Sequence, residues 1–138
     1  MIKKDYYNSI YIFILGCAST FSLPPYNYFI INFVTFSLFF ILIFNKKKLC
    51  RSNYPFFLYG WFFGFGYFLL SLYWISISLT FDRTFSYLIP IATILIPGFL
   101  AIFYGLITYL FSIFYSKKII LSFLIFSILF GTVELIRG

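Results

Sequence analysis

The sequence predicts an all-α protein, a polytopic bundle of about five transmembrane helices that occupies the whole chain, residues 1–138. The first observation is composition: hydrophobic residues make up 63% and charged residues 9%, whereas soluble domains average about 45–50% and about 25%. The second is that long apolar runs alternate with short connections. The third is that positive charges cluster at every second connection. So few charges cannot cover a soluble domain of this size, and lipid is therefore expected around most of the exterior.

The first two predicted helices are joined by a tight turn. The first covers about residues 7–23 and stops because Pro24-Pro25 cannot continue a helix. The turn that follows is short and carries no charge. The second helix covers about residues 28–44 and is expected to end at a basic cluster within residues 46–51. Both runs are close to the roughly 20 mostly apolar residues that a transmembrane helix needs.

Three further helices complete the predicted bundle. The third covers about residues 55–79 and begins at Pro55, a residue favoured in the first helical turn. The fourth covers about residues 85–115 and is expected to kink at Pro97-Gly98. The fifth covers residues 119–138 and follows a short lysine-containing hairpin.

The basic residues predict the orientation of the bundle. With alternating sides, eight lysine and arginine residues fall on one side of the membrane and two on the other. Because cationic loops are retained in the cytoplasm, we expect a cytoplasmic N-terminus. The first side holds Lys3, Lys4, Lys46, Lys47, Lys48, Arg51, Lys117 and Lys118, and the second holds Arg83 and Arg137.

Composition also argues against a metal centre and against nucleic-acid binding. The chain has no histidine, the commonest metal ligand and general base. Cys17 and Cys50 lie at different predicted depths, so neither a disulfide nor a metal site is expected. The net charge of +7 comes from clusters between apolar runs, not from a basic stripe on a folded surface. We expect no metal, no cofactor and no nucleic-acid partner.

The N-terminal segment has two interpretations. A positive start, an apolar stretch and Gly16-Cys17 are together similar to a lipoprotein signal peptide, in which cleavage would leave Cys17 lipidated. However, Leu15 is larger than the small residue usual before such a site, and Asp5 weakens the positive region. The favoured interpretation is an uncleaved helix whose small residues 16–19 pack closely against a neighbour.

Two motifs carry residues with a specific structural use. Gly60 and Gly64 form a GxxxG pair, with Gly66 two residues further on, and such glycines let another helix approach closely. Ordinary helix packing explains the glycines alone. Glu134 and Arg137 are three residues apart near the end of the fifth helix and can pair on one face. This pair either ends the helix at the interface or shapes an outward-facing site.

Four short motifs follow one another along the chain. They are Phe21-Ser22-Leu23-Pro24-Pro25-Tyr26, then Gly60-Trp61-Phe62-Phe63-Gly64-Phe65-Gly66, then Leu72-Tyr73-Trp74-Ile75, and finally Glu134-Leu135-Ile136-Arg137-Gly138. In this order and spacing they resemble the N-terminal membrane region of bacterial apolipoprotein N-acyltransferases. No single motif is specific, and the resemblance rests on all four, which together cover essentially the whole chain.

The resemblance implies a reaction that composition does not. Members of this family sit in the bacterial inner membrane and transfer an acyl chain from a phospholipid to the N-terminal diacylglyceryl-cysteine of lipoproteins. The implied chemistry is a cysteine thioester with a glutamate base and a lysine at the oxyanion. Those residues belong to a nitrilase-like domain on the outer side of the membrane, inserted later in the chain. The implied partners are membrane phospholipid and, through that domain, the lipoprotein substrate.

The sequence departs from the family by stopping at Gly138, where members continue with more helices and the nitrilase-like domain. Cys17, Cys50 and Glu134 do not match the catalytic positions, so no catalytic residue is expected in this chain. We expect the N-terminal membrane part of such an enzyme, a scaffold and lipid-access region that is inactive alone. The alternative is a small stand-alone integral membrane protein that binds lipid or partner subunits without catalysis. Oligomeric state stays open.

Overall fold

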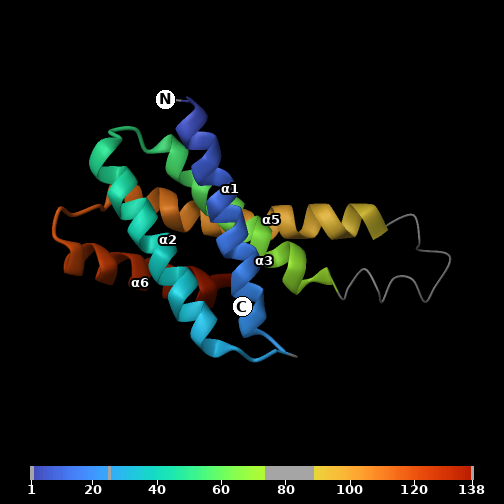
Figure 1. Cartoon of the computed structure of the whole chain (residues 1–138). Helices are drawn as coiled ribbons and strands as arrows, with labels where there is room; N and C mark the ends of the chain where they lie inside the picture. The colour runs from blue at the N-terminus through green and yellow to red at the C-terminus, as the bar shows by residue number, and fades with distance from the viewer. Residues whose placement is uncertain (1, 25, 74–88, 138) are drawn as a thin grey trace.

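The computed structural model describes the backbone of residues 2–24, 26–73 and 89–137, and the side chains of residues 7–24, 26–73 and 92–136. In these residues the protein is all-α, as predicted, with five α-helices (Figure 1). The elements are α1 (Ile2–Ser19), the 3-10 helix η1 (Thr20–Ser22), α2 (Phe29–Leu49), α3 (Tyr54–Ser71), α5 (Ile89–Ile113) and α6 (Ile119–Arg137).

Helix α1 begins and ends earlier than the predicted range of 7–23. It starts at Ile2 and stops at Ser19, where the chain tightens into η1. Side-chain hydroxyls cause this change. Thr20 Oγ1 donates to the carbonyl of Cys17 at 2.6 Å, and Ser22 Oγ donates to that of Ser19 at 2.7 Å. Such local bonds offer the backbone an alternative to the α-helical pattern, so the helix ends before the prolines.

Helix α2 is longer than the predicted range of 28–44, because it continues through the lysines to Leu49. Lys46, Lys47 and Lys48 form its last turn, and the backbone N–H of Cys50 still bonds to the carbonyl of Lys46 at 2.9 Å. Lysine is a good helix former, and a cation is stabilised beside the negative end of the helix dipole. Loss of hydrophobicity therefore does not mark the end of the helix here.

The remaining helices begin close to their expected positions. Helix α3 has Pro55 in its first turn and is capped at Leu72, while the rest of its predicted range, 74–79, lies outside the described residues. Helix α5 runs from Ile89 to Ile113 as one element with Pro97 inside it, so the helix continues through the position of the expected kink. Residues 85–88 of that prediction are outside the described part of the chain.

Three helices are long and apolar enough to cross a membrane by length and composition: Phe29–Leu49, Ala92–Ile113 and Ile119–Ile136. Much of their surface faces outward. Ile30 on α2 is 78% exposed and Ile120 on α6 is 74% exposed. Contiguous apolar surface of this kind is unfavourable in water and favourable in hydrocarbon. The protein is a multi-pass membrane protein.

Helix α3 occupies the centre of the arrangement. It packs most extensively against α5 and next against α1, while α2 contacts α1 and α6, and α6 contacts α5. Successive helices run in alternating directions. As a result, the N-terminal end of α1, the α2–α3 connection and the α5–α6 connection lie toward one end of the molecule, and the α1–α2 connection lies toward the other (Figure 1).

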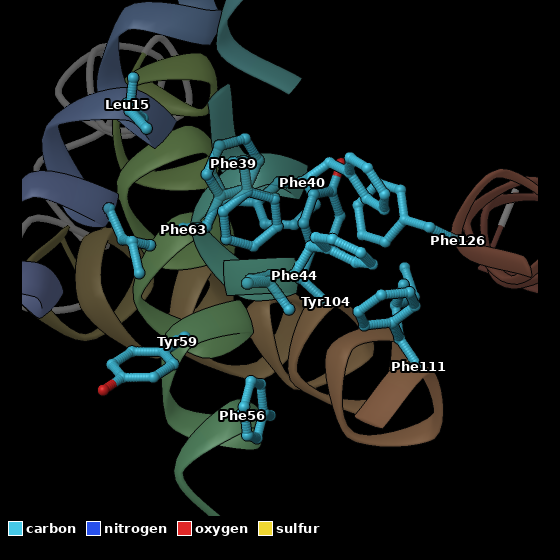
Figure 2. Close-up of a cluster of buried hydrophobic side chains, with 14 residues drawn as sticks. Leu15, Phe39, Phe40, Phe44, Phe56, Tyr59, Phe63, Tyr104, Phe111 and Phe126 are labelled. Atoms are coloured by element: carbon cyan, nitrogen blue, oxygen red, sulfur yellow. The ribbon is translucent and has the colours of Figure 1, made fainter. Parts of the chain in front are cut away.

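Aromatic rings fill the space between the helices. Phe39 on α2 and Phe63 on α3 are both fully buried, and their rings stack with centroids 4.1 Å apart. Phe111 on α5 and Phe126 on α6 meet edge to face at 5.7 Å in the same cluster (Figure 2). Edge-to-face and offset pairs are the favourable aromatic geometries, so this cluster joins four helices mainly through ring contacts.

Candidate functional site

Two glycines bring α3 and α5 into close contact. A Cβ added to Gly64 would lie 2.8 Å from Cβ of Tyr104 and 3.1 Å from Cα of Ala101. A Cβ on Gly60 would collide with the hydroxyl of Thr108 and the carbonyl of Tyr104. Any larger side chain at either position would therefore push the two helices apart. The predicted GxxxG pair lies at the most extensive helix contact in the structure.

Thr108 adds a polar link at the same contact. Its Oγ1 donates to the carbonyl of Phe56 on α3 at 2.6 Å and also lies near the carbonyls of its own helix. Thr108 is fully buried. In lipid such a hydroxyl needs an internal acceptor, and an interhelical bond supplies one. The start of α3 is thereby joined to the C-terminal half of α5.

The opposite side of α3 meets α1 in the same way. A Cβ on Gly66 would lie 2.5 Å from the carbonyl oxygen of Phe13 and 3.2 Å from Sγ of Cys17. A Cβ on Gly16 would collide with the carbonyl of Phe63. Cys17 Sγ lies 3.6 Å from the carbonyl oxygen of Gly66. Gly16 and Cys17 thus pack against α3, and the interpretation of an uncleaved first helix stays a prediction.

Trp61 projects from α3 toward the middle of α5. Its indole Nε1 donates to the carbonyl of Gly98 at 3.1 Å, and its ring stacks on Phe65 with centroids 5.0 Å apart. The acceptor directly follows Pro97, which has no N–H and so removes one bond from the helical ladder. Trp61 therefore adds an interhelical hydrogen bond one residue after the proline inside α5.

A half-buried carboxylate is held between α5 and α6. The hydroxyl of Tyr104 donates to Oε1 of Glu134 at 2.8 Å. Tyr104 is 3% exposed, and its ring meets Phe130 edge to face at 5.0 Å. Glu134 is the one acidic side chain that the structure describes, and it sits in the last turn of α6, where the helix dipole disfavours negative charge. The phenol offsets this by donating to the carboxylate.

The other predicted site residues are not gathered at this centre. Pro24 and Tyr26 are exposed in the α1–α2 turn, where Tyr26 meets Phe21 with ring centroids 5.3 Å apart. Tyr73, just after α3, is 59% exposed. Pro25 and Trp74 lie outside the described residues. Arg137 ends α6, but its side chain is also outside them, so the predicted pairing of Glu134 with Arg137 stays a prediction.

Sequence reasoning missed Tyr104 and Thr108. Both lie on the fourth apolar run, four residues apart and therefore on one helix face. That spacing of two polar groups inside a membrane segment was the available signal. A second missed contact joins α1 to α2, where Ser19 Oγ donates to Thr35 Oγ1 at 2.7 Å. Within the described residues, no group of three or more histidine, cysteine or acidic side chains could hold a metal ion.

Comparison with known proteins identifies the family. The profile of the family described as "Apolipoprotein N-acyltransferase N-terminal domain" matches residues 15–138. The apolipoprotein N-acyltransferase of Rhizobium etli is 37% identical over 107 residues, which cover 73% of this chain and 20% of that protein. The protein of the same name from Brucella suis is 35% identical over 101 residues, covering 67% of this chain and 19% of the relative.

A third relative, from Rhizobium rhizogenes, is 38% identical over 96 residues, covering 65% of this chain and 18% of its own length. The chain thus spans about a fifth of the length of the curated relatives that it matches. No solved structure gives a significant match. Since the profile covers all but the first turns of the bundle, the chain belongs to the apolipoprotein N-acyltransferase N-terminal domain family.

Proposed function

We propose that residues 1–138 serve as the membrane scaffold of an apolipoprotein N-acyltransferase. In this role the bundle anchors a catalytic domain at the membrane and offers acyl chains a lateral route toward it. The substrates are then a membrane phospholipid, which donates the acyl chain, and the N-terminal diacylglyceryl-cysteine of a lipoprotein, which accepts it. The observation that carries the proposal is the family match over residues 15–138.

The residues described here support a scaffold and do not supply a nucleophile with its base. Cys17 is packed between α1 and α3 against Gly66. Cys50 follows the lysines that end α2, far along the chain from Glu134. Glu134 accepts a hydrogen bond from Tyr104. Covalent acyl transfer requires a thiolate within hydrogen-bond reach of a base, so we infer that this bundle by itself does not transfer acyl chains.

The proposal includes an orientation in the bacterial inner membrane. Every lysine and arginine side chain that the structure describes lies in residues 46–51 or 117–118, at the end of the bundle where the α2–α3 and α5–α6 connections are found. Positive connections of this kind are retained in the cytoplasm. The N-terminus is therefore cytoplasmic, and Glu134, near the other end of α6, lies toward the outer face.

A chimera tests the function. Residues 15–138 replace the matching segment of the Rhizobium etli enzyme, and the chimera is expressed in cells depleted of their own acyltransferase. We expect mass spectrometry of a reporter lipoprotein to show N-acylation. The matched control is the same chimera with Gly64→Leu, which separates α3 from α5 and should abolish N-acylation.

Two results would count against the proposal. N-acylation by residues 1–138 expressed alone would show that the bundle is catalytic and not only a scaffold. A chimera that inserts stably but leaves the reporter unacylated would favour the alternative, a stand-alone membrane protein that binds lipid or partner subunits.

A further inference from the structure

A cavity of about 580 Å³ lies at the lysine-rich end of the bundle. Its walls come from two segments that are far apart in the sequence, the end of α2 with the residues after it and the connection between α5 and α6. These two segments lie toward the same end of the molecule in Figure 1. The lining includes Lys47, Lys48, Arg51, Lys117, Leu49 and Tyr115.

The charge of this cavity is one-sided. Four of its lining side chains are cationic, and none of the lining side chains that the structure describes is acidic. Four like charges around one cavity repel each other, and an anion between them would remove that repulsion. The wall also carries Leu49, which is 88% exposed, and the aromatic ring of Tyr115. The cavity therefore combines positive charge with apolar surface.

Two of the lysines are held in place by the scaffold. The ammonium of Lys48 lies 4.5 Å from the ring centroid of Phe44, and that of Lys47 lies 5.2 Å from the ring of Phe56. Lys47 also donates a hydrogen bond to Oδ1 of Asn53. Cation–π contacts and this hydrogen bond restrict both side chains. The free-energy cost of ordering the two lysine side chains when an anion binds is therefore lower.

The position of the cavity selects a lipid over a free anion. The apolar spans of α2, α5 and α6 end or begin at Leu49, Ile113 and Ile119, so the cavity lies at the level where headgroups meet hydrocarbon. On α6, which begins two residues after Lys117, Ile120 and Leu124 are exposed. When a lipid headgroup lies among these cations, the acyl chains of that lipid lie along the surface of α6.

We propose that this cavity binds the phosphate headgroup of an anionic glycerophospholipid. The volume lies within the range of about 300–1,000 Å³ typical of small-molecule sites and exceeds what one phosphate ion fills. Basic cavities between membrane helices on the cytoplasmic side bind such headgroups. The site lies about 22 Å along α6 from Glu134, by helix rise. It depends on membrane insertion and not on acyl transfer.

The test uses the purified chain in neutral detergent, titrated with phosphatidylglycerol and read by native mass spectrometry. The key comparison is Lys117→Gln against Lys118→Gln. Both lysines are exposed and adjacent in one connection, but only Lys117 lines the cavity. We expect Lys117→Gln to weaken phosphatidylglycerol binding about fivefold and Lys118→Gln to change it less than about twofold.

A charge-matched double comparison sharpens the result. Lys47→Gln with Lys117→Gln removes two cavity cations, while Lys46→Gln with Lys118→Gln removes two cations from the same segments that do not line it. The first pair should lower the affinity about 25-fold, the product of two fivefold losses. Because both pairs remove the same charge from the same segments, any effect on membrane orientation is common to them.

Several results would overturn the proposal. Equal weakening by the two pairs would indicate diffuse surface attraction and no site. Phosphatidylcholine binding as tightly as phosphatidylglycerol would exclude recognition of an anionic headgroup, and displacement of the lipid by inorganic phosphate alone would indicate a free-phosphate site. If circular dichroism shows that the Lys47 variant has lost helix content, the single substitutions in the exposed connection decide the question.

Discussion

The ring of Tyr104 is enclosed by aromatic side chains of α3 and α6, while its hydroxyl reaches the carboxylate of Glu134. One side chain thus serves the apolar core and a polar contact together. A buried phenol usually finds a hydrogen-bond partner, and a carboxylate at membrane depth is costly without one. Each group therefore satisfies the requirement of the other.

The hydrogen bond between Tyr104 and Glu134 should contribute measurably to stability. Tyr104→Phe keeps the ring and removes the donor, so we expect unfolding in detergent to become easier by about 1–3 kcal/mol. Tyr109→Phe on the same helix is the matched control, because Tyr109 is 37% exposed. Equal losses for the two variants would argue against a specific role for this bond.

A double-mutant cycle with Glu134→Leu, which removes the acceptor oxygens, separates this contact from general packing. If the carboxylate is the acceptor that matters, the combined substitution should cost less than the sum of the two single ones. Strict additivity would mean that the 2.8 Å contact has no coupling energy.

At the level of elements, α3 contacts its two main neighbours through backbone. Gly60 and Gly64 face α5, and Gly66 faces α1. Because a helix offers few attractive forces toward another helix in lipid beyond close packing and interhelical bonds, these glycines determine how near the helices can come.

Alanine at Gly64 should therefore destabilise the bundle. The added Cβ would meet Tyr104 Cβ at 2.8 Å and backbone of Ala101 at 3.1 Å, so we expect a loss of about 1–3 kcal/mol from overpacking. Gly131→Ala on α6 is the control, since no atom lies within 4 Å of the added Cβ there. That variant should gain about 0.5–1 kcal/mol from helix propensity.

Detergent unfolding followed by circular dichroism measures both alanine variants. A Gly64→Ala protein as stable as the original would show that α3 and α5 do not touch as closely as described.

The helices themselves could be predicted from the sequence, but some of their ends could not. Runs of apolar residues identify α2 and α6 because lipid requires about the same length of every spanning helix. The end of α2 was placed too early, because lysine leaves the apolar pattern without leaving the helix. The end of α1 depends on hydroxyl bonds from Thr20 and Ser22, which hydropathy does not register.

The sequence predicted only those parts of the candidate site whose residues lie close together in one segment of the chain. Gly60 and Gly64 could be recognised because their spacing is local. The bond from Tyr104 to Glu134 joins residues 30 positions apart and depends on how α5 and α6 face each other. Spacing along one helix contains no such information, so the sequence indicated a partner on the same helix, Arg137.

At the level of the whole molecule, the distribution of charge predicts which connections face the cytoplasm. Cys50 lies in the α2–α3 connection with Arg51, whereas Tyr26 lies in the uncharged α1–α2 turn and is 58% exposed. In a Cys17→Ala background, an impermeant thiol reagent should label Cys50 only after the cells are permeabilised.

The matched control for this labelling carries its thiol in the opposite turn. Tyr26→Cys, combined with Cys17→Ala and Cys50→Ala, should react in intact cells. Labelling of Cys50 in intact cells together with protection at position 26 would invert the proposed orientation.

The glycine contacts on α3 involve helices that are translated at different times. A ribosome completes α1 before α3 and α5 after it, so the seam between Gly16 and Gly66 can close while the segment with Tyr104 has not yet been translated. Helix α3 is not among the three strongly apolar spans, and of the two glycine-contacting neighbours that the structure describes, α1 is translated before α3 and α5 after it. The chain order therefore allows the contact at Gly66 to form before the contact at Gly60.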